Sequence, residues 1–297
     1  MTGKRRIRQS QDDRLFDIIN TLLCIFVFIV VLYPLIFVVS ASFSDPLAVL
    51  SGKVKLLPVD ITLDSYKKIF DYKQVLTGYK NSLILLFFGT ALNVVLTIMA
   101  AYPLSRRDLY GRRLLTALFT FTMFFSGGLI PTYFVVRDLG LYDTLGAMII
   151  PIAINMYNVI ITRTYFENSI PESLIEAAYI DGANNLATLR FIVLPMSKAI
   201  IAIICLYYGV GHWNQYFQAL IYISDSAKYP LQVVLREILL QSQVQDLVDT
   251  VGFEKQLLQA EGIKYSLIIV ASVPVLAIYP FVQRYFVKGV MIGAVKG

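Results

Sequence analysis

The chain has 297 residues, of which 57% are hydrophobic and only 15% are charged, and its mean hydropathy is +0.66. Soluble domains carry about 25% charged residues, so this composition excludes an ordinary soluble domain and indicates a membrane protein. The formal net charge of +6 at pH 7 does not call for a nucleic-acid partner, because the basic residues follow the pattern of cytoplasmic membrane loops.

Long charge-free stretches are the first feature along the chain. A helix needs about 20 mostly apolar residues to cross a hydrocarbon core of ~30 Å, and a backbone in lipid must satisfy its own hydrogen bonds. We therefore predict an all-α integral membrane protein with one transmembrane domain, 1–297, and six transmembrane helices. The predicted spans cover about 15–40, 81–105, 114–136, 142–163, 198–224 and 265–285.

The first stretch follows a basic N-terminus and therefore has the flanks of a signal peptide. Its apolar run is longer than the roughly 7–15 residues of a signal-peptide core. We interpret it as a retained span.

Loop charges predict the orientation of the spans. The loop 105–113 contains Arg106, Arg107, Arg112 and Arg113, whereas the loop 137–143 contains only Arg137. Cytoplasmic loops carry an excess of Lys and Arg. This pattern places both termini in the cytoplasm.

Two longer outer loops, 45–80 and 225–264, complete the predicted topology. Residues 63–72 have apolar side chains at helical spacing and predict a short amphipathic helix. A second helix is predicted to begin at Pro230, in the run PLQVVLREIL, since proline suits the first turn of a helix.

A polar, glycine-punctuated segment separates the fourth and fifth spans. Ser169 can cap a helix, with Glu172 three residues later in the capping-box position. Gly182 fits a helix stop, where a left-handed residue is needed. Asn184 can begin a second helix that Pro195 ends. The segment therefore predicts two short cytoplasmic helices joined by a tight turn.

Two interpretations of this cytoplasmic loop, 166–197, remain open on physical grounds. It is either an interfacial hairpin at the lipid headgroups or a docking helix for another protein. The small pair Ala177 and Ala178 near a glycine favours docking, because small side chains allow another protein surface to come close.

The spacing EAA-x3-G-x9-I-x-L-P, which begins at Glu176 and ends at Pro195, resembles the EAA signature of ABC importer permeases. Nearly the whole chain is similar to MalG-type permeases of carbohydrate importers, including AYPLSR before the basic loop and QRYFVKGVMIGAVKG at the C-terminus. The resemblance is nearest to the branch that handles complex, often acidic, oligosaccharides of plants or algae.

The resemblance implies a type I ABC importer permease fold whose first short cytoplasmic helix is a coupling helix on a separate ATPase subunit. The implied coupling residues are Glu176, Ala177, Ala178, Asp181 and Gly182. The family's C-terminal tail also reaches the ATPase, which assigns Gly289, Gly293, Ala294 and Gly297 to that contact. The chain contains no GxxxxGK[ST] sequence, so we expect no cofactor in this chain, with ATP and Mg bound by the partner ATPase.

The resemblance also implies the partners. They are a second permease subunit in a heterodimer, two ATPase subunits, an extracellular solute-binding protein, an oligosaccharide substrate and membrane lipid. The expected location is the bacterial cytoplasmic membrane.

Polar and aromatic residues inside the spans are candidates for the substrate path, because intramembrane polar groups usually face a bundle interior or an aqueous path. Packing against a partner permease and aromatic anchoring at the membrane boundary are the alternatives. The candidates are Asn155, Asn158, Tyr208, His212, Trp213, Asn214 and Tyr216.

Two rival functions stay open at this stage. One is an ABC importer permease for a non-sugar solute, and the other is a membrane-embedded enzyme or scaffold. His212 has no second metal-ligand side chain beside it in its span, which argues against a metal site. The chain offers no nucleophile–base–acid constellation that would favour an enzyme.

Overall fold

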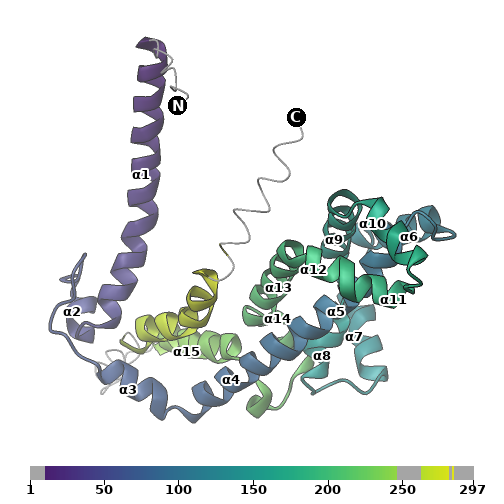
Figure 1. Ribbon diagram of the computed structural model, residues 1–297. Coiled ribbons are helices and arrows are strands. Elements are labelled where there is room, and N and C mark those ends of the chain that lie inside the picture. Colours follow the sequence, from purple (N-terminus) through teal and green to yellow (C-terminus); the bar gives the residue numbers. More distant parts are fainter. Residues whose placement is uncertain (1–10, 246–261, 281–282, 284–297) are drawn as a thin grey trace. The chain divides into compact units, whose positions relative to one another are not determined.

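The computed structural model describes residues 11–245, 262–280 and 283, and these residues form helices and connecting turns without a β-strand (Figure 1). The chain divides into two compact units, Met1–Asp71 with Ile238–Val270 and Tyr72–Glu237 with Ala271–Gly297. We describe each unit by itself. The predicted ATPase contact of Gly289, Gly293, Ala294 and Gly297 lies outside the described residues.

The first unit begins with a long apolar helix, α1, and continues through two short helices. They are α1 (Gln11–Ser42), α2 (Pro46–Leu50) and α3 (Asp64–Asp71). The helix α3 confirms the predicted amphipathic helix, and it buries Ser65 and Ile69. A further helix begins at Gly262, where a Cβ atom would lie 2.4 Å from the Ser65 hydroxyl. Glycine is therefore needed for this close approach.

The second unit contains the remaining helices. They are α4 (Lys73–Ile84), the π-helix η1 (Leu85–Gly89), α5 (Thr90–Ser105), α6 (Arg112–Phe124), α7 (Leu129–Asp138), α8 (Gly146–Ile149), the 3-10 helix η2 (Ile150–Ile152), α9 (Met156–Ser169), α10 (Glu172–Ile180), α11 (Asn185–Thr188), the π-helix η3 (Leu189–Val193), α12 (Leu194–Met196), α13 (Lys198–Trp213), α14 (Phe217–Tyr222), the 3-10 helix η4 (Ser226–Lys228) and the start of α15 (Leu231–Gln245). The helix α15 confirms the predicted helix after Pro230.

Among the described residues, three helices are long and apolar enough to cross a membrane, and three bent helix pairs also qualify if each pair forms one span. The continuous helices are Asp12–Ser42, Lys73–Ser105 and Gly262–Pro280. The bent pairs join α6 to α7 at 112°, α8 and η2 to α9 at 52°, and the helical run Asn185–Met196 to α13 at 84°. Counting each pair as one span gives up to six, by length and composition.

Three stretches predicted as single spans are interrupted in the structure. The stretch 142–163 breaks between η2 and α9, with a bend of 52°. The stretch 114–136 breaks between α6 and α7, where Gly128 adopts φ +86°. The stretch 198–224 breaks after α13, and a separate helix begins at Phe217. Apolar composition predicts that a stretch lies in lipid, but it does not indicate where the backbone turns within that stretch.

The main core of the second unit lies where α5 packs against α9 and α13. Ala101 of α5, Val159 of α9 and Ile204 of α13 are completely buried there. The two helices that flank the loop predicted to be cytoplasmic, 166–197, therefore share one supporting helix. Figure 1 shows α9 to α12 gathered at one end of this unit.

Candidate functional site

The helix α10 carries the EAA residues and ends in a glycine corner. Its C-cap is Asp181, and Gly182 follows with φ +80°. The Gly182 N–H donates to the Tyr179 carbonyl at 3.0 Å, and the Ala183 N–H donates to the Ala178 carbonyl at 2.8 Å. These two bonds form a Schellman motif, so the predicted helix stop at Gly182 is confirmed.

The predicted capping box at the start of α10 is wrong. Ser169 is the last residue of α9, and the N-cap of α10 is Pro171, which makes no side-chain cap bond. The Glu172 carboxylate instead pairs with Arg107 at 3.2 Å. A tertiary ion pair has replaced the local bond that the sequence pattern suggested.

The second short helix begins and ends within one residue of the predicted positions. The Asn184 side chain accepts a bond from the Ala187 N–H at 2.8 Å and caps α11. The helical run then continues through η3 and past Pro195 to Met196, and the chain turns at Ser197. Pro195 lacks the backbone N–H that a helix interior needs, and the run ends one residue after it.

The predicted coupling residues separate into exposed and buried positions. Glu176, Ala177, Asp181 and Gly182 are exposed. Ala178 is buried, with 6% of its surface exposed. In this chain Ala178 therefore supports α10 from within, while its neighbours form the outer surface.

Tyr179 links α10 to two other segments. Its hydroxyl donates to the Asn185 side chain at 2.5 Å, which joins α10 to α11 across the glycine corner. Arg106 donates to the same hydroxyl at 3.4 Å, and its guanidinium carbon lies 5.4 Å from the centre of the Tyr179 ring. The basic loop after α5 thus holds the corner in position.

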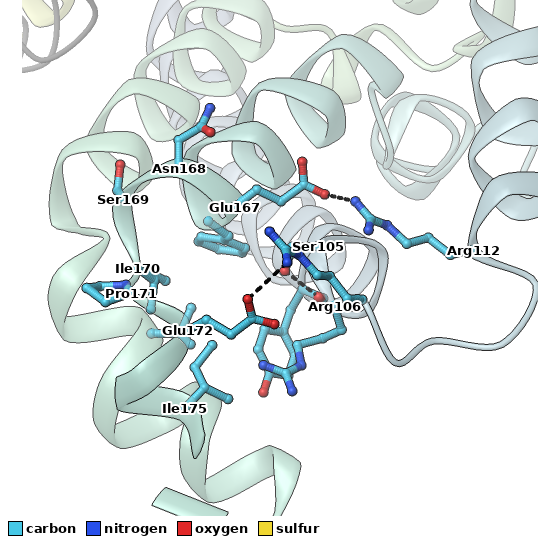
Figure 2. Close-up of a pocket in the computed structure, with 14 residues that line it drawn as sticks. Ser105, Arg106, Arg112, Glu167, Asn168, Ser169, Ile170, Pro171, Glu172 and Ile175 are labelled. Atoms are coloured by element: carbon cyan, nitrogen blue, oxygen red, sulfur yellow. Dashed lines mark hydrogen bonds and ion pairs between the residues drawn. The ribbon is translucent and has the colours of Figure 1, made fainter. Parts of the chain in front are cut away.

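Carboxylates and arginines form a second link between the basic loop and this segment (Figure 2). Glu167 near the end of α9 pairs with Arg112, and Arg163 donates to the same carboxylate at 3.0 Å. Arg112 also donates to the Leu104 carbonyl at 2.9 Å. Arg112 and Glu167, together with Glu172 and its neighbours, line a polar cavity of about 470 Å³.

Sequence reasoning missed the role of Tyr179 and of the residues that pair with the basic loop. Arg106, Arg107 and Arg112 were used for topology alone, although acidic residues at both predicted helix ends offered partners. Charge complementarity between two loops predicted to lie on the same side of the membrane was the available signal. The pairing itself depends on tertiary contact.

The predicted substrate-path residues do not share one environment. Four are buried, namely Asn158, Tyr208, His212 and Trp213. Three are exposed, namely Asn155, Asn214 and Tyr216. The structure therefore does not bring the whole set to one surface.

The buried residues form polar networks within the helix bundle. The Tyr208 hydroxyl lies 2.6 Å from the Thr97 hydroxyl and accepts a bond from the Asn155 backbone N–H at 3.1 Å. His212 Nε2 lies 3.2 Å from Asn93 Nδ2, so the amide donates to the imidazole. These bonds satisfy polar groups that would otherwise be costly to bury.

Trp213 and Gln215 tie the end of α13 to other segments of the same unit. The Trp213 Nε1–H donates to the Ala271 carbonyl at 3.0 Å, and the Gln215 amide donates to the Met148 carbonyl at 2.7 Å. Both bonds are buried and fix helix positions. Their side chains therefore act in packing within this chain.

Asp143 organises the loops that were predicted to face outward. Its carboxylate accepts a bond from Lys228 at 2.7 Å and bonds from the Ser224 and Asp225 N–H groups at 2.9 and 3.0 Å. The Lys228 bond is the largest cause that lowers the pKa of Asp143 to about 2. The same pair raises the pKa of Lys228. The ion pair is therefore charged at neutral pH.

Comparison with known proteins agrees with this architecture. Residues 1–292 match the family described as "Binding-protein-dependent transport system inner membrane component". Protein LplC of Bacillus subtilis strain 168 is 42% identical over 293 residues, which cover 98% of each chain. The polygalacturonan/rhamnogalacturonan transport system permease protein YtcP of the same strain is 45% identical over 287 residues, which cover 96% of this chain and 99% of the relative.

A solved structure matches the fold over nearly the whole chain. It is a chain from the crystal structure of a bacterial ABC transporter involved in the import of the acidic polysaccharide alginate, with a TM-score of 0.86 and 36% identity. The match covers 94% of this chain and 99% of that chain. These findings confirm the predicted all-α, type I ABC importer permease fold and the multi-pass membrane location. The chain therefore belongs to the family of inner-membrane components of binding-protein-dependent transport systems.

Proposed function

We propose that this chain is one permease subunit of an ATP-driven importer that translocates an oligosaccharide delivered by an extracellular solute-binding protein. In this proposal the chain pairs with a second permease, and two ATPase subunits bind ATP and Mg in the cytoplasm. The observation that carries the coupling role is the helix α10, which ends in a glycine corner and presents an exposed outer surface.

The proposed docking surface consists of the exposed residues Glu176, Ala177, Ile180, Asp181 and Gly182. Ile180 has 86% of its surface exposed, a large fraction for an isoleucine. Exposed apolar side chains rimmed by polar residues are typical of protein interaction sites. Ala177 and Gly182 add little bulk, so an ATPase groove can approach the backbone closely.

Motion of α10 would reach the membrane helices through bonded contacts. Tyr179 and Glu172 connect α10 to the basic loop that follows α5. The flanking helices α9 and α13 both pack against α5. A displacement at the coupling surface therefore moves several helices together, as rigid-body mechanisms of alternating access require.

The substrate class follows from the relatives and from the chemistry of the spans. YtcP is named for polygalacturonan and rhamnogalacturonan, and the matching structure comes from an alginate importer. All three are carbohydrates that contain uronic acids. Tyrosine and asparagine side chains within the spans suit sugars, because aromatic rings contact C–H faces and amides bond hydroxyl groups.

Reconstitution tests this proposal. The chain, its second permease, the ATPases and the binding protein are assembled in liposomes and given labelled uronic-acid oligosaccharides, an amino acid or phosphate. We expect uptake of the oligosaccharide alone, dependent on ATP. Uptake of the amino acid or phosphate instead would identify a non-sugar importer and refute the substrate assignment.

The coupling contact needs its own test. A cysteine in place of Ala177 should cross-link to the ATPase within the assembled complex, since this position is exposed on α10. A cysteine in place of the buried Ala178 should cross-link far less. Equal capture at both positions, or none at Ala177, would contradict the proposed docking surface.

A further inference from the structure

Exposed polar and aromatic side chains lie on α9 and α13, two helices that pack against each other within one unit. We call the group the tyrosine face. It consists of Asn155, Tyr157, Tyr207, Gly211 and Asn214, all exposed. Positions 207, 211 and 214 recur at the spacing of one helix face, so the exposure follows a stripe.

A lipid-facing helix of the same chain has a different composition. The exposed positions of α1 are dominated by apolar side chains such as Leu22, Phe26 and Ile29. Side chains that face hydrocarbon are expected to be apolar, whereas polar groups in a span mark a bundle interior or an aqueous path. The tyrosine face therefore does not have the chemistry of a lipid-facing surface.

The two tyrosines lie close together. Their ring centres are 6.5 Å apart with planes inclined at 44°. Tyr157 and Tyr207 fall within the stretches predicted as spans, 142–163 and 198–224.

Gly211 leaves open space on the tyrosine face between Tyr207 and Asn214. A Cβ atom at this position would meet nothing within 4 Å. Gly209, two residues earlier, would place a Cβ atom 3.3 Å from Leu86. The glycine at 211 thus packs against none of the residues that the structure describes, and the face carries no side chain at this point.

We infer that the tyrosine face contacts the oligosaccharide during translocation, an inference that rests on the proposed import function. Tyr157 and Tyr207 offer ring surfaces to the C–H faces of sugar units. Asn155 uses its carbonyl oxygen to cap α9, and Asn214 donates its amide to the Val210 carbonyl at 3.0 Å. The remaining amide groups, an N–H pair on Asn155 and an oxygen on Asn214, complement sugar hydroxyl groups.

The charge of the two helices suits an acidic sugar as well as a neutral one. The sequence of α13 contains no Asp or Glu. The one carboxylate on α9, Glu167, is held by Arg163 and Arg112. No carboxylate on these helices is therefore left to repel a uronic acid that passes along the face.

The test uses the complete transporter in liposomes with labelled uronic-acid oligosaccharide. Gly211→Trp adds a large ring to the tyrosine face at a position that carries no side chain. Gly211→Ala is its matched control. We expect Gly211→Trp to lower uptake at least about tenfold and Gly211→Ala to leave it within about twofold, since only the large ring obstructs the path. Tyr207→Ala should raise the apparent KM about two- to tenfold through loss of an aromatic contact. Phe88→Ala, at an exposed apolar position, should leave the apparent KM unchanged.

Each outcome of this test bears on either the inferred sugar contact or the proposed function. Unchanged uptake by Gly211→Trp in an intact complex would overturn the inference, because the face would then look toward lipid. Dissociation of the two permeases in both Gly211→Trp and Tyr207→Ala would assign the face to the subunit interface and also overturn it. Failure of the unsubstituted transporter to import the oligosaccharide would refute the proposed function itself, so the two failures are distinguishable.

Thiol accessibility provides a readout that is independent of transport. Gly211→Cys is introduced after Cys24→Ser and Cys205→Ala remove the native thiols. A charged, membrane-impermeant thiol reagent should label the new cysteine, and bound oligosaccharide should slow the labelling. Absence of labelling, or labelling that the sugar does not slow, would contradict a sugar-contacting aqueous face.

Discussion

At Gly182 the backbone adopts a conformation that side chains with a Cβ atom rarely accept. Its φ is +80°, and the Schellman bonds of its neighbours depend on that angle. A Cβ atom there would meet nothing within 4 Å in this chain. The requirement for glycine is therefore set by the backbone angle and, in the proposed docking contact, by the approach of an ATPase surface.

Replacement of Gly182 by Val should uncouple ATP hydrolysis from uptake. A non-glycine residue at positive φ costs about 1–3 kcal/mol, which favours a rearranged corner and a displaced α10. We expect uptake to fall about tenfold, since 1.4 kcal/mol corresponds to a factor of ten, while membrane insertion is retained. Gly182→Asn is the control, because Asn tolerates the left-handed region, and it should retain more uptake. Normal uptake by Gly182→Val would contradict the assignment.

Asp143 supports a pH prediction at the same scale. Its folded pKa of about 2 lies below the ordinary value of 3.8. The carboxylate therefore stabilises the fold above pH 3.8, and this contribution is lost as the pH falls toward 2. The thermal midpoint of the unsubstituted chain in detergent should exceed that of Asp143→Asn at about pH 5, and the difference should shrink near pH 2. A difference in thermal midpoint that does not change with pH would refute the contribution assigned to the Asp143 carboxylate.

At the scale of helices, the close contact between η1 and α13 depends on the glycine at position 89. A Cβ atom at Gly89 of η1 would lie 2.5 Å from His212 Nε2 and 2.6 Å from its Cε1 atom. His212 is buried with 1% exposure and bonded to Asn93. The imidazole therefore cannot move aside without breaking a buried polar network.

Gly89→Ala and Gly209→Ala form a matched pair that tests this contact. Overpacking a buried site costs about 1–3 kcal/mol, so Gly89→Ala should lower the thermal midpoint clearly. At Gly209 the nearest atom is the end of the flexible Leu86 side chain at 3.3 Å, so the effect should be smaller. Equal midpoints for the two variants would contradict the packing of η1 against α13.

The helix bends also belong to this scale, and the sequence located only some of them. The turn at Gly182 was predictable because glycine after a helical pattern has a specific backbone role. Pro195 likewise marked the end of the second short helix to within one residue, because proline cannot continue the backbone hydrogen bonds of a helix. Local patterns identify helix stops better when the stop itself requires a special residue.

For the whole molecule, the proposed function assigns the energy source to partner ATPase subunits. The sequence lacks a GxxxxGK[ST] motif, and the proposed coupling surface is exposed at one end of a unit. In the proposed importer, nucleotide-driven closure of the ATPases would move α10 and the helices attached to it.

A reconstitution series checks the prediction at this level. Liposomes with this chain and its second permease, but without the ATPases, should neither hydrolyse ATP nor accumulate oligosaccharide. Addition of the ATPases and the binding protein should restore both activities. ATP hydrolysis by this chain alone would contradict the assignment of that activity to the partner ATPases.

The amino-acid sequence was sufficient for the membrane class, the EAA signature and the glycine corner. These features depend on composition, on spacing along the chain and on one residue's backbone preference. None of them requires knowledge of which distant segments meet.

The environment of each polar side chain followed only from the folded arrangement. Tyr207 and Tyr208 are neighbours in sequence, yet the first is exposed and the second is bonded within the core. Successive residues of a helix point about 100° apart, so the packing of α13 against α5 and α9 decides which tyrosine is buried. Tertiary packing thereby separates the structural network from the face that we infer to contact the sugar.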